Sequence, residues 1–115
     1  MALEMTTDDL AQGCKVVRAV GEIDLHSVEL FEETFQDLLA NQPKSLLIDL
    51  TGIRFMSSSG IGVLMTCNAA YEGTDGKLVL ILGDGTVRES LKLIGILDLI
   101  PVVASEQEAL ARIGL

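Results

Sequence analysis

The sequence predicts an α/β domain in which a mixed sheet of about four to five strands packs with about four helices. Short runs of branched apolar residues alternate with segments of helical periodicity along the chain. Of the 115 residues, 49% are hydrophobic and 22% are charged, which is typical of a folded protein. The predicted connections are short, and neither a linker nor a repeat divides the chain. We therefore expect residues 1–115 to form a single domain.

Four runs rich in branched apolar residues indicate strands. They cover residues 14–20, 45–50, 77–82 and 100–103. A weaker pattern at residues 3–8 predicts a further strand, which would form a hairpin with the first run through residues 9–13.

Two segments of helical period lie between these strands. The segment 27–40 places Val28, Phe31, Phe35, Leu38 and Leu39 on one face. The segment 58–72 spaces Ile61, Leu64, Met65 and Ala69 by three and four residues, and the glycines at 73 and 76 end it. Both helices are therefore expected to pack one apolar face against the sheet.

Two capping boxes predict where the last two helices begin. In residues 86–89 and 105–108, a hydroxyl residue precedes a glutamate by three positions, so that side chains can satisfy the free N–H groups of a first helical turn. We expect these helices to end near Gly95 and Gly114.

Composition argues against several classes of function. The formal net charge of −9 would repel nucleic acid, so none is expected as a partner. No apolar run approaches the roughly 20 residues that cross a bilayer, and the first residues lack a signal pattern, so we expect no membrane insertion and a cytoplasmic location. Cys14 and Cys67 match no metal or redox motif with the single histidine, so no metal or cofactor is expected. Both thiols are predicted to be buried, although the sequence leaves a disulfide open.

The carboxyl ends of two predicted strands are candidates for a functional site. In open α/β sheets, functional residues gather where strands lead into helices. Residues 21–24 follow the strand 14–20, and residues 51–59 follow the strand 45–50. If these strands are parallel neighbours, Asp24 and Ser58 lie on the same edge of the sheet.

Ser57, Ser58 and Ser59 open the helix 58–72 just before Gly60 and Ile61. Free N–H groups and the positive end of the helix dipole make this a favourable place for a phosphate. An equally simple interpretation is that one serine only caps the helix. In the same way, Asp24 and Ser27 would cap the helix 27–40, and Asp49 would hydrogen-bond a turn.

Catalysis by one of these serines is disfavoured. The segment does not contain G-x-S-x-G, and His26, the only imidazole, lies at the start of another helix among acidic residues. Nucleotide binding is disfavoured too, because neither phosphate-binding glycine motif is present. We therefore expect a binding protein and not an enzyme.

The chain resembles the bacterial anti-sigma-factor antagonists, which are STAS-domain proteins. The resemblance rests on six segments, in the family's order and with similar spacing: residues 21–24, 49–53, 55–62, 76–80, 93–97 and 100–102. It implies a STAS-like fold and a partner-switching role. The unphosphorylated protein would bind an anti-sigma factor that is also a serine kinase, and phosphorylation would release it. A PP2C-type phosphatase would reverse the modification.

The resemblance also implies which residues act. The family's target serine stands two positions before the glycine of a D-S-S/T-G motif, which corresponds to Ser58, with Ser57 and Ser59 as less favoured sites. Ser57 replaces the family's usual aspartate, so a like charge beside the phosphate and a contact to the kinase or phosphatase are lost. Asp24 matches a position near the partner-binding surface, which would also include residues 57–61. The alternative is a STAS subunit of a membrane transport complex, where no phosphate is involved.

Overall fold

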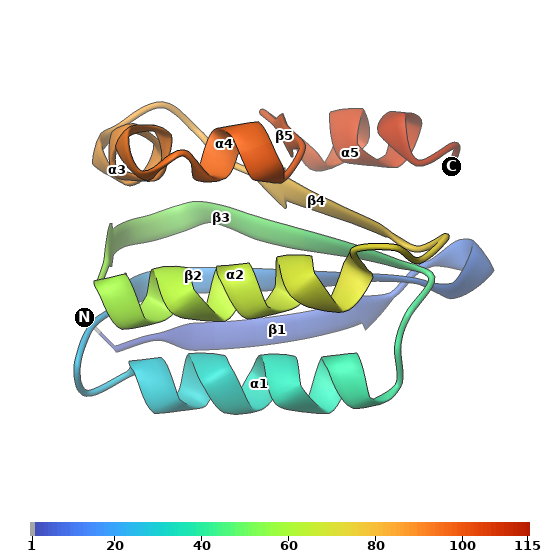
Figure 1. Cartoon of the computed structure of the whole chain (residues 1–115). Helices are drawn as coiled ribbons and strands as arrows, with labels where there is room; N and C mark the ends of the chain where they lie inside the picture. Colours follow the sequence, from blue (N-terminus) through green and yellow to red (C-terminus); the bar gives the residue numbers. More distant parts are fainter. Residues whose placement is uncertain (1) are drawn as a thin grey trace.

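Five strands form one mixed sheet in the computed structural model, which describes residues 2–115. They are β1 (Glu4–Asp9), β2 (Cys14–Ile23), β3 (Ser45–Met56), β4 (Lys77–Ile81) and β5 (Val102–Val103). The strands lie in chain order, with β1 antiparallel to β2 and every later pair parallel (Figure 1). The predicted mixed sheet and its amino-terminal hairpin are therefore confirmed.

Helices cover both faces of this sheet unequally. They are the 3₁₀ turn η1 (Ala11–Gly13) and the α-helices α1 (Val28–Ala40), α2 (Ser58–Tyr71), α3 (Thr86–Ile94), α4 (Ile96–Leu99) and α5 (Glu106–Arg112). Helices α1 and α2 lie side by side across one face (Figure 1). Residues of α3 and α4 join the same core, whereas α5 packs on the opposite face.

The central strand β3 shows how the sequence builds these layers. Leu46, Ile48 and Leu50 face the core under α1 to α4, while Leu47 faces the smaller core under α5. Successive side chains of a strand point to opposite faces, so a strand covered on both sides is apolar at consecutive positions. The run 46–48 therefore belongs to the middle of a covered sheet.

Strands β2 and β3 are longer than the sequence predicted. Their pairing continues to Ile23 and Met56 through two register shifts. Gly21 has a φ of 121°, and a Cβ on it would lie 2.3 Å from the carbonyl oxygen of Ala2. The predicted strands ended too early because the runs of branched apolar residues stop at Val20 and Leu50, whereas Gly21 and Gly52 lie beside bulges within paired strands.

The two predicted capping boxes have different outcomes. Ser105 caps α5, because its hydroxyl accepts a hydrogen bond from the Glu108 N–H at 3.1 Å. The box at Thr86 is wrong: Gly85 is the N-cap residue of α3 and Thr86 is its first helical residue. Gly95 ends α3 with a φ of 88°, as predicted, and α5 ends at Arg112, two residues before Gly114.

The buried face of α2 also differs from the prediction. Ile61 and Leu64 are buried as expected, but Met65 and Ala69 are exposed, and Val63 and Cys67 are buried in their place. Helix α2 itself carries no charged residue that would mark its solvent-facing side, so apolar spacing alone gave the wrong face. The short helix α4 was not predicted because one turn carries too little periodicity.

Both cysteines are buried and free, as expected for small apolar side chains. Burial raises the pKa of Cys14, and it raises the pKa of Cys67 to about 12. Among residues 2–115, no group of histidine, cysteine or acidic side chains is arranged to hold a metal ion. None of the helices described is both long enough and apolar enough to span a membrane.

Candidate functional site

The carboxyl ends of β2 and β3 meet at one edge of the sheet. The two strands are parallel neighbours, and the Ser57 N–H donates to the Ile23 carbonyl at 2.8 Å just beyond their last paired residues. This bond ties the turn after β2 to the start of α2. Asp24 and Ser58 therefore lie on the same edge of the sheet, as the parallel pairing requires.

A network of short hydrogen bonds fixes the turn between β2 and α1. The Asp24 carboxylate accepts from the N–H groups of His26 at 2.9 Å and of Ser27 at 3.1 Å. The bond from His26, with those from Ser27, holds the pKa of Asp24 below its ordinary value. The Ser27 hydroxyl donates to the Glu22 carbonyl at 2.7 Å, and the Asp24 N–H donates to that hydroxyl. Asp24 therefore organises its own turn. The predicted side-chain caps do not form, because Ser27 is the N-cap residue of α1 and no side chain there makes a capping hydrogen bond.

The three serines at the start of α2 occupy different environments. Ser57 is the N-cap residue, and its hydroxyl accepts from the Gly60 N–H at 3.3 Å. Ser58 and Ser59, the first two helical residues, are both exposed. Within residues 2–115, no hydrogen-bond partner is found for the Ser58 hydroxyl. Capping is thus carried by Ser57, which leaves Ser58 free for other chemistry.

Gly60 and Ile61 are buried and fix the position of the start of α2. A Cβ on Gly60 would lie 2.7 Å from Cγ2 of Ile23 and 3.1 Å from Cγ of Met56. Ile61 is only 9% exposed and packs in the main core. The absence of a side chain at Gly60 thus lets α2 approach the end of β2 closely. Gly60 and Ile61 are both buried, so they set the position of the serines and do not form the exposed surface.

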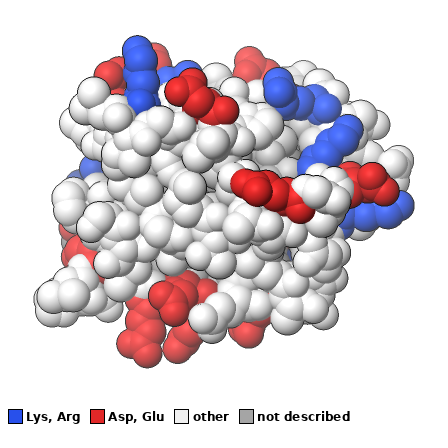
Figure 2. Space-filling model, viewed as in Figure 1, with Lys and Arg blue, Asp and Glu red and all other residues white. Residues whose placement is uncertain are grey.

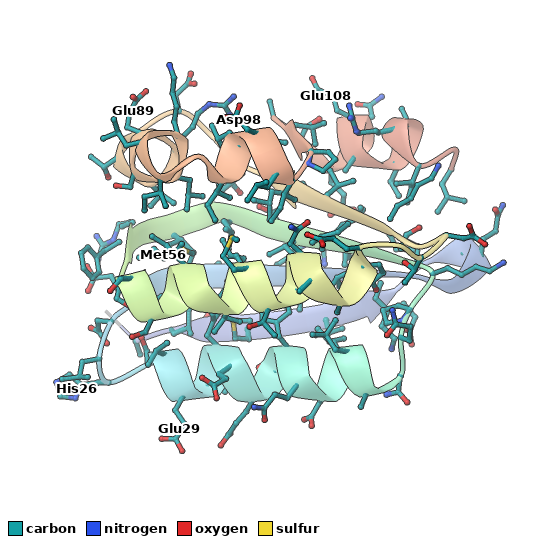
Figure 3. All side chains as sticks on the ribbon, viewed as in Figure 1. His26, Glu29, Met56, Glu89, Asp98 and Glu108 are labelled. Atoms are coloured by element: carbon teal, nitrogen blue, oxygen red, sulfur yellow. The ribbon has the colours of Figure 1, made fainter. Side chains whose placement is uncertain are left out.

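Two exposed apolar side chains at the same edge were missed by the sequence analysis. Leu25 follows Asp24 in the turn after β2 and is 84% exposed, and Phe55 near the end of β3 is 51% exposed. Their neighbour His26 projects from this end of the molecule, where Met56 also lies (Figure 3). The sequence did contain a signal for the exposure of Leu25. It is an apolar residue between Asp24 and His26, and a tight polar turn cannot bury it. Leu25 and Phe55 thus leave apolar surface exposed at the same edge of the sheet as Ser58.

Comparison with known proteins identifies the family. The family model described as "STAS domain" matches residues 6–109. This chain belongs to the STAS domain family. The match includes most of β1, the whole serine-bearing helix and part of α5, so the resemblance of the sequence to STAS-domain proteins is confirmed over nearly the whole fold.

Individual STAS relatives share both sequence and fold with the chain. It is 29% identical over 84 residues to the "Anti-sigma-F factor antagonist RsfB" of Mycobacterium tuberculosis, covering 73% of this chain and 68% of the relative. It is 28% identical over 112 residues to the "Anti-sigma F factor antagonist" of Lysinibacillus sphaericus, covering 96% and 92%. A solved anti-sigma factor antagonist from Mycobacterium paratuberculosis superposes with a TM-score of 0.86 at 25% identity, covering 96% of this chain and 93% of that one.

Proposed function

We propose that this STAS protein is an anti-sigma factor antagonist that acts by partner switching in the cytoplasm. In its unphosphorylated form it binds an anti-sigma factor that is also a serine kinase, and so frees the sigma factor. Phosphorylation of Ser58 releases it, and a PP2C-type phosphatase restores it. The observation that carries the proposal is the exposed Ser58 hydroxyl at the start of α2, which has no hydrogen-bond partner among the described residues. The names of the relatives support the same role.

Ser58 is a better phosphate acceptor than the serines beside it. The Ser57 hydroxyl is half-buried and engaged with the Gly60 N–H, so its modification would remove the helix cap. Ser59 is exposed, but it lies one position further into the helix and lines the groove toward α1. We propose that Asp24 and residues 57–61 form the partner-binding region, with Gly60 and Ile61 acting through the position of the helix.

Local repulsion and desolvation explain the switch without refolding. A phosphate adds about −1.5 to −2 charges at neutral pH and three acceptor oxygens. Within the chain, the free N–H groups of α2 and the positive end of its dipole accommodate this charge. At an interface the same dianion would lose water without gaining a matched cation. A penalty of about 3 kcal/mol in binding free energy would raise the Kd for the partner roughly 100-fold.

The test is phosphate transfer from the anti-sigma factor kinases of the source organism, purified one by one and supplied with ATP. We expect one kinase to label the wild-type chain, and mass spectrometry to map the phosphate to Ser58. The S58A variant should lose the label and still bind that kinase. S59A should still carry the label, and S90A, which removes an exposed serine of α3 outside the proposed binding region, should be labelled normally. Normal labelling of S58A would show that the site is elsewhere.

Binding provides a second measure of the proposal. We expect S58D to bind the labelling kinase at least about tenfold more weakly than S58A, since a carboxylate carries only part of the charge of a phosphate. The role as antagonist would be refuted if no such kinase bound the wild-type chain and the protein co-purified with a membrane transporter instead.

A further inference from the structure

Helix α2 presents an uncharged surface on an otherwise acidic molecule. Its fourteen residues include no charged side chain, although the chain carries a formal net charge of −9. Its exposed side consists of Ser58, Ser59, Gly62, Met65, Thr66 and Ala69. Figure 2 shows a broad uncharged band across the middle of this face, where Figure 1 places α2. Charged residues normally cover the solvent side of a surface helix, so this side is unusual for a helix that contacts only water.

A groove of about 350 Å³ lies between α2 and α1. The buried side chains of Phe35, Val63 and Cys67 line it, together with exposed Gly62 and Thr66. The Thr66 hydroxyl donates to the Gly62 carbonyl at 3.1 Å, so this polar group already has a partner within its own helix. The floor of the groove therefore offers mainly apolar contact.

Gly62 is a glycine inside α2 that the fold of the domain does not require. Glycine is among the least favourable residues for the interior of a helix. At Gly60 the fold requires it, because a Cβ would collide with Ile23. At Gly62 a Cβ would meet no atom within 4 Å. Since nothing inside the domain requires glycine there, the open space above Gly62 leaves room for a second molecule to approach the helix closely.

The rim of the groove restricts the chemistry of that molecule. Glu32 lines the groove from α1, and Glu29 and Glu33 are exposed on the same helix. Acidic side chains border the uncharged band on the side of α1 (Figure 2). A helix with an apolar face and basic residues along one flank matches both features.

We propose that the α1–α2 groove seats an amphipathic helix of the anti-sigma partner, with apolar side chains packed over Gly62 and Thr66 and a lysine or arginine beside Glu32. This inference rests on the proposed function. It extends the contact from Ser58 along roughly two turns of α2, a distance of about 12 Å. The partner thus contacts the exposed side of α2 over about two turns, as well as the serine at its start.

The first test fills the groove without disturbing the fold. We expect G62L to be at least as stable as the wild-type chain in urea, and to bind the kinase that labels Ser58 about tenfold more weakly. The matched control is A111L, which adds a leucine to an exposed position of α5 on the opposite face of the sheet. It should bind like the wild-type chain. If G62L binds as tightly as A111L, the partner does not enter the groove.

The second test addresses the acidic rim. We expect E32K to weaken binding about tenfold at low salt and much less at 0.5 M NaCl, since salt screens exposed charges. The neighbouring E33K variant, which does not line the groove, is the matched control. Equal effects of E32K and E33K would contradict a basic residue seated beside Glu32.

The outcomes separate this inference from the proposed function. Tight binding by G62L together with weak binding by S58D overturns the groove and leaves the antagonist role intact. Failure of the wild-type chain to bind any kinase overturns both. Sedimentation equilibrium of the purified protein alone gives a third outcome: a dimer that G62L converts to a monomer would assign the groove to a second copy of this chain.

Discussion

At the scale of single residues, burial of ionisable groups couples stability to alkaline pH. Burial raises the pKa of Cys67 to about 12, from 9.0 when exposed, and that of Tyr71 to about 12, from 10.0. Between about pH 9 and pH 12 the unfolded chain therefore releases protons that the folded chain retains. Because the unfolded state binds fewer protons in this range, the free energy of unfolding falls as the pH rises.

We accordingly expect the urea midpoint to fall between pH 8 and pH 10.5, with a smaller fall in C67A than in the wild-type chain. The comparison concerns slopes against pH, since the cavity left by C67A lowers stability at every pH. Native Cys67 should also resist alkylation at pH 8 and react once the chain is unfolded. Equal slopes for the two proteins would indicate that Cys67 does not titrate as its burial requires.

At the scale of elements, the packing of α2 on the end of β2 depends on one glycine. We expect G60A to lower the free energy of unfolding by about 1 to 3 kcal/mol, because the added methyl group would overlap Ile23 and press on Met56. Alanine at Gly62 meets no atom within 4 Å and should raise it by about 0.5 to 1 kcal/mol through helix propensity. Urea denaturation of both variants measures the difference, and a stabilised G60A would contradict the close approach.

The same elements explain which parts of the fold the sequence predicted. Helix α1 was correct to within one residue because glutamates on its solvent side gave its apolar face a clear phase. Helix α2 has no such charges, so its ends were predicted well and its buried face was not. The ends of β2 and β3 were misplaced because Gly21 and Gly52 continue a bulged pair of strands. Bulges depend on pairing between strands, which a single sequence does not contain.

At the scale of the whole molecule, the candidate site was predictable because topology determines it. Parallel neighbouring strands bring Asp24 and Ser58 to one edge, and short runs of apolar residues were enough to predict those strands. The exposed Leu25 and Phe55 and the groove beside Gly62 were not predictable in this way. They depend on which apolar side chains remain uncovered after packing, and this emerges only when α1, α2 and the two strand ends are placed together.

Because Ser58 lies at the exposed start of α2, phosphorylation there should leave the fold unchanged. Ser58 is exposed, and its hydroxyl makes no hydrogen bond to the rest of residues 2–115. A helix N-terminus stabilises an anion by about 0.3 to 1 kcal/mol, so the free energy of unfolding of the phosphorylated chain should differ from that of the unmodified chain by about 1 kcal/mol or less. Chemical denaturation measures this difference.

Amide NMR spectra of the two forms locate any change. We expect shifts confined to residues 24–27 and 55–62, with the amides of α5 and β4 unmoved, because the added charge lies at the edge of the sheet and the packed core separates it from them. The unphosphorylated S58A variant serves as the control for loss of the hydroxyl. If the shifts instead extended across the sheet to α5, release of the partner would require a rearrangement of the domain, and local repulsion at the interface would no longer account for the switch.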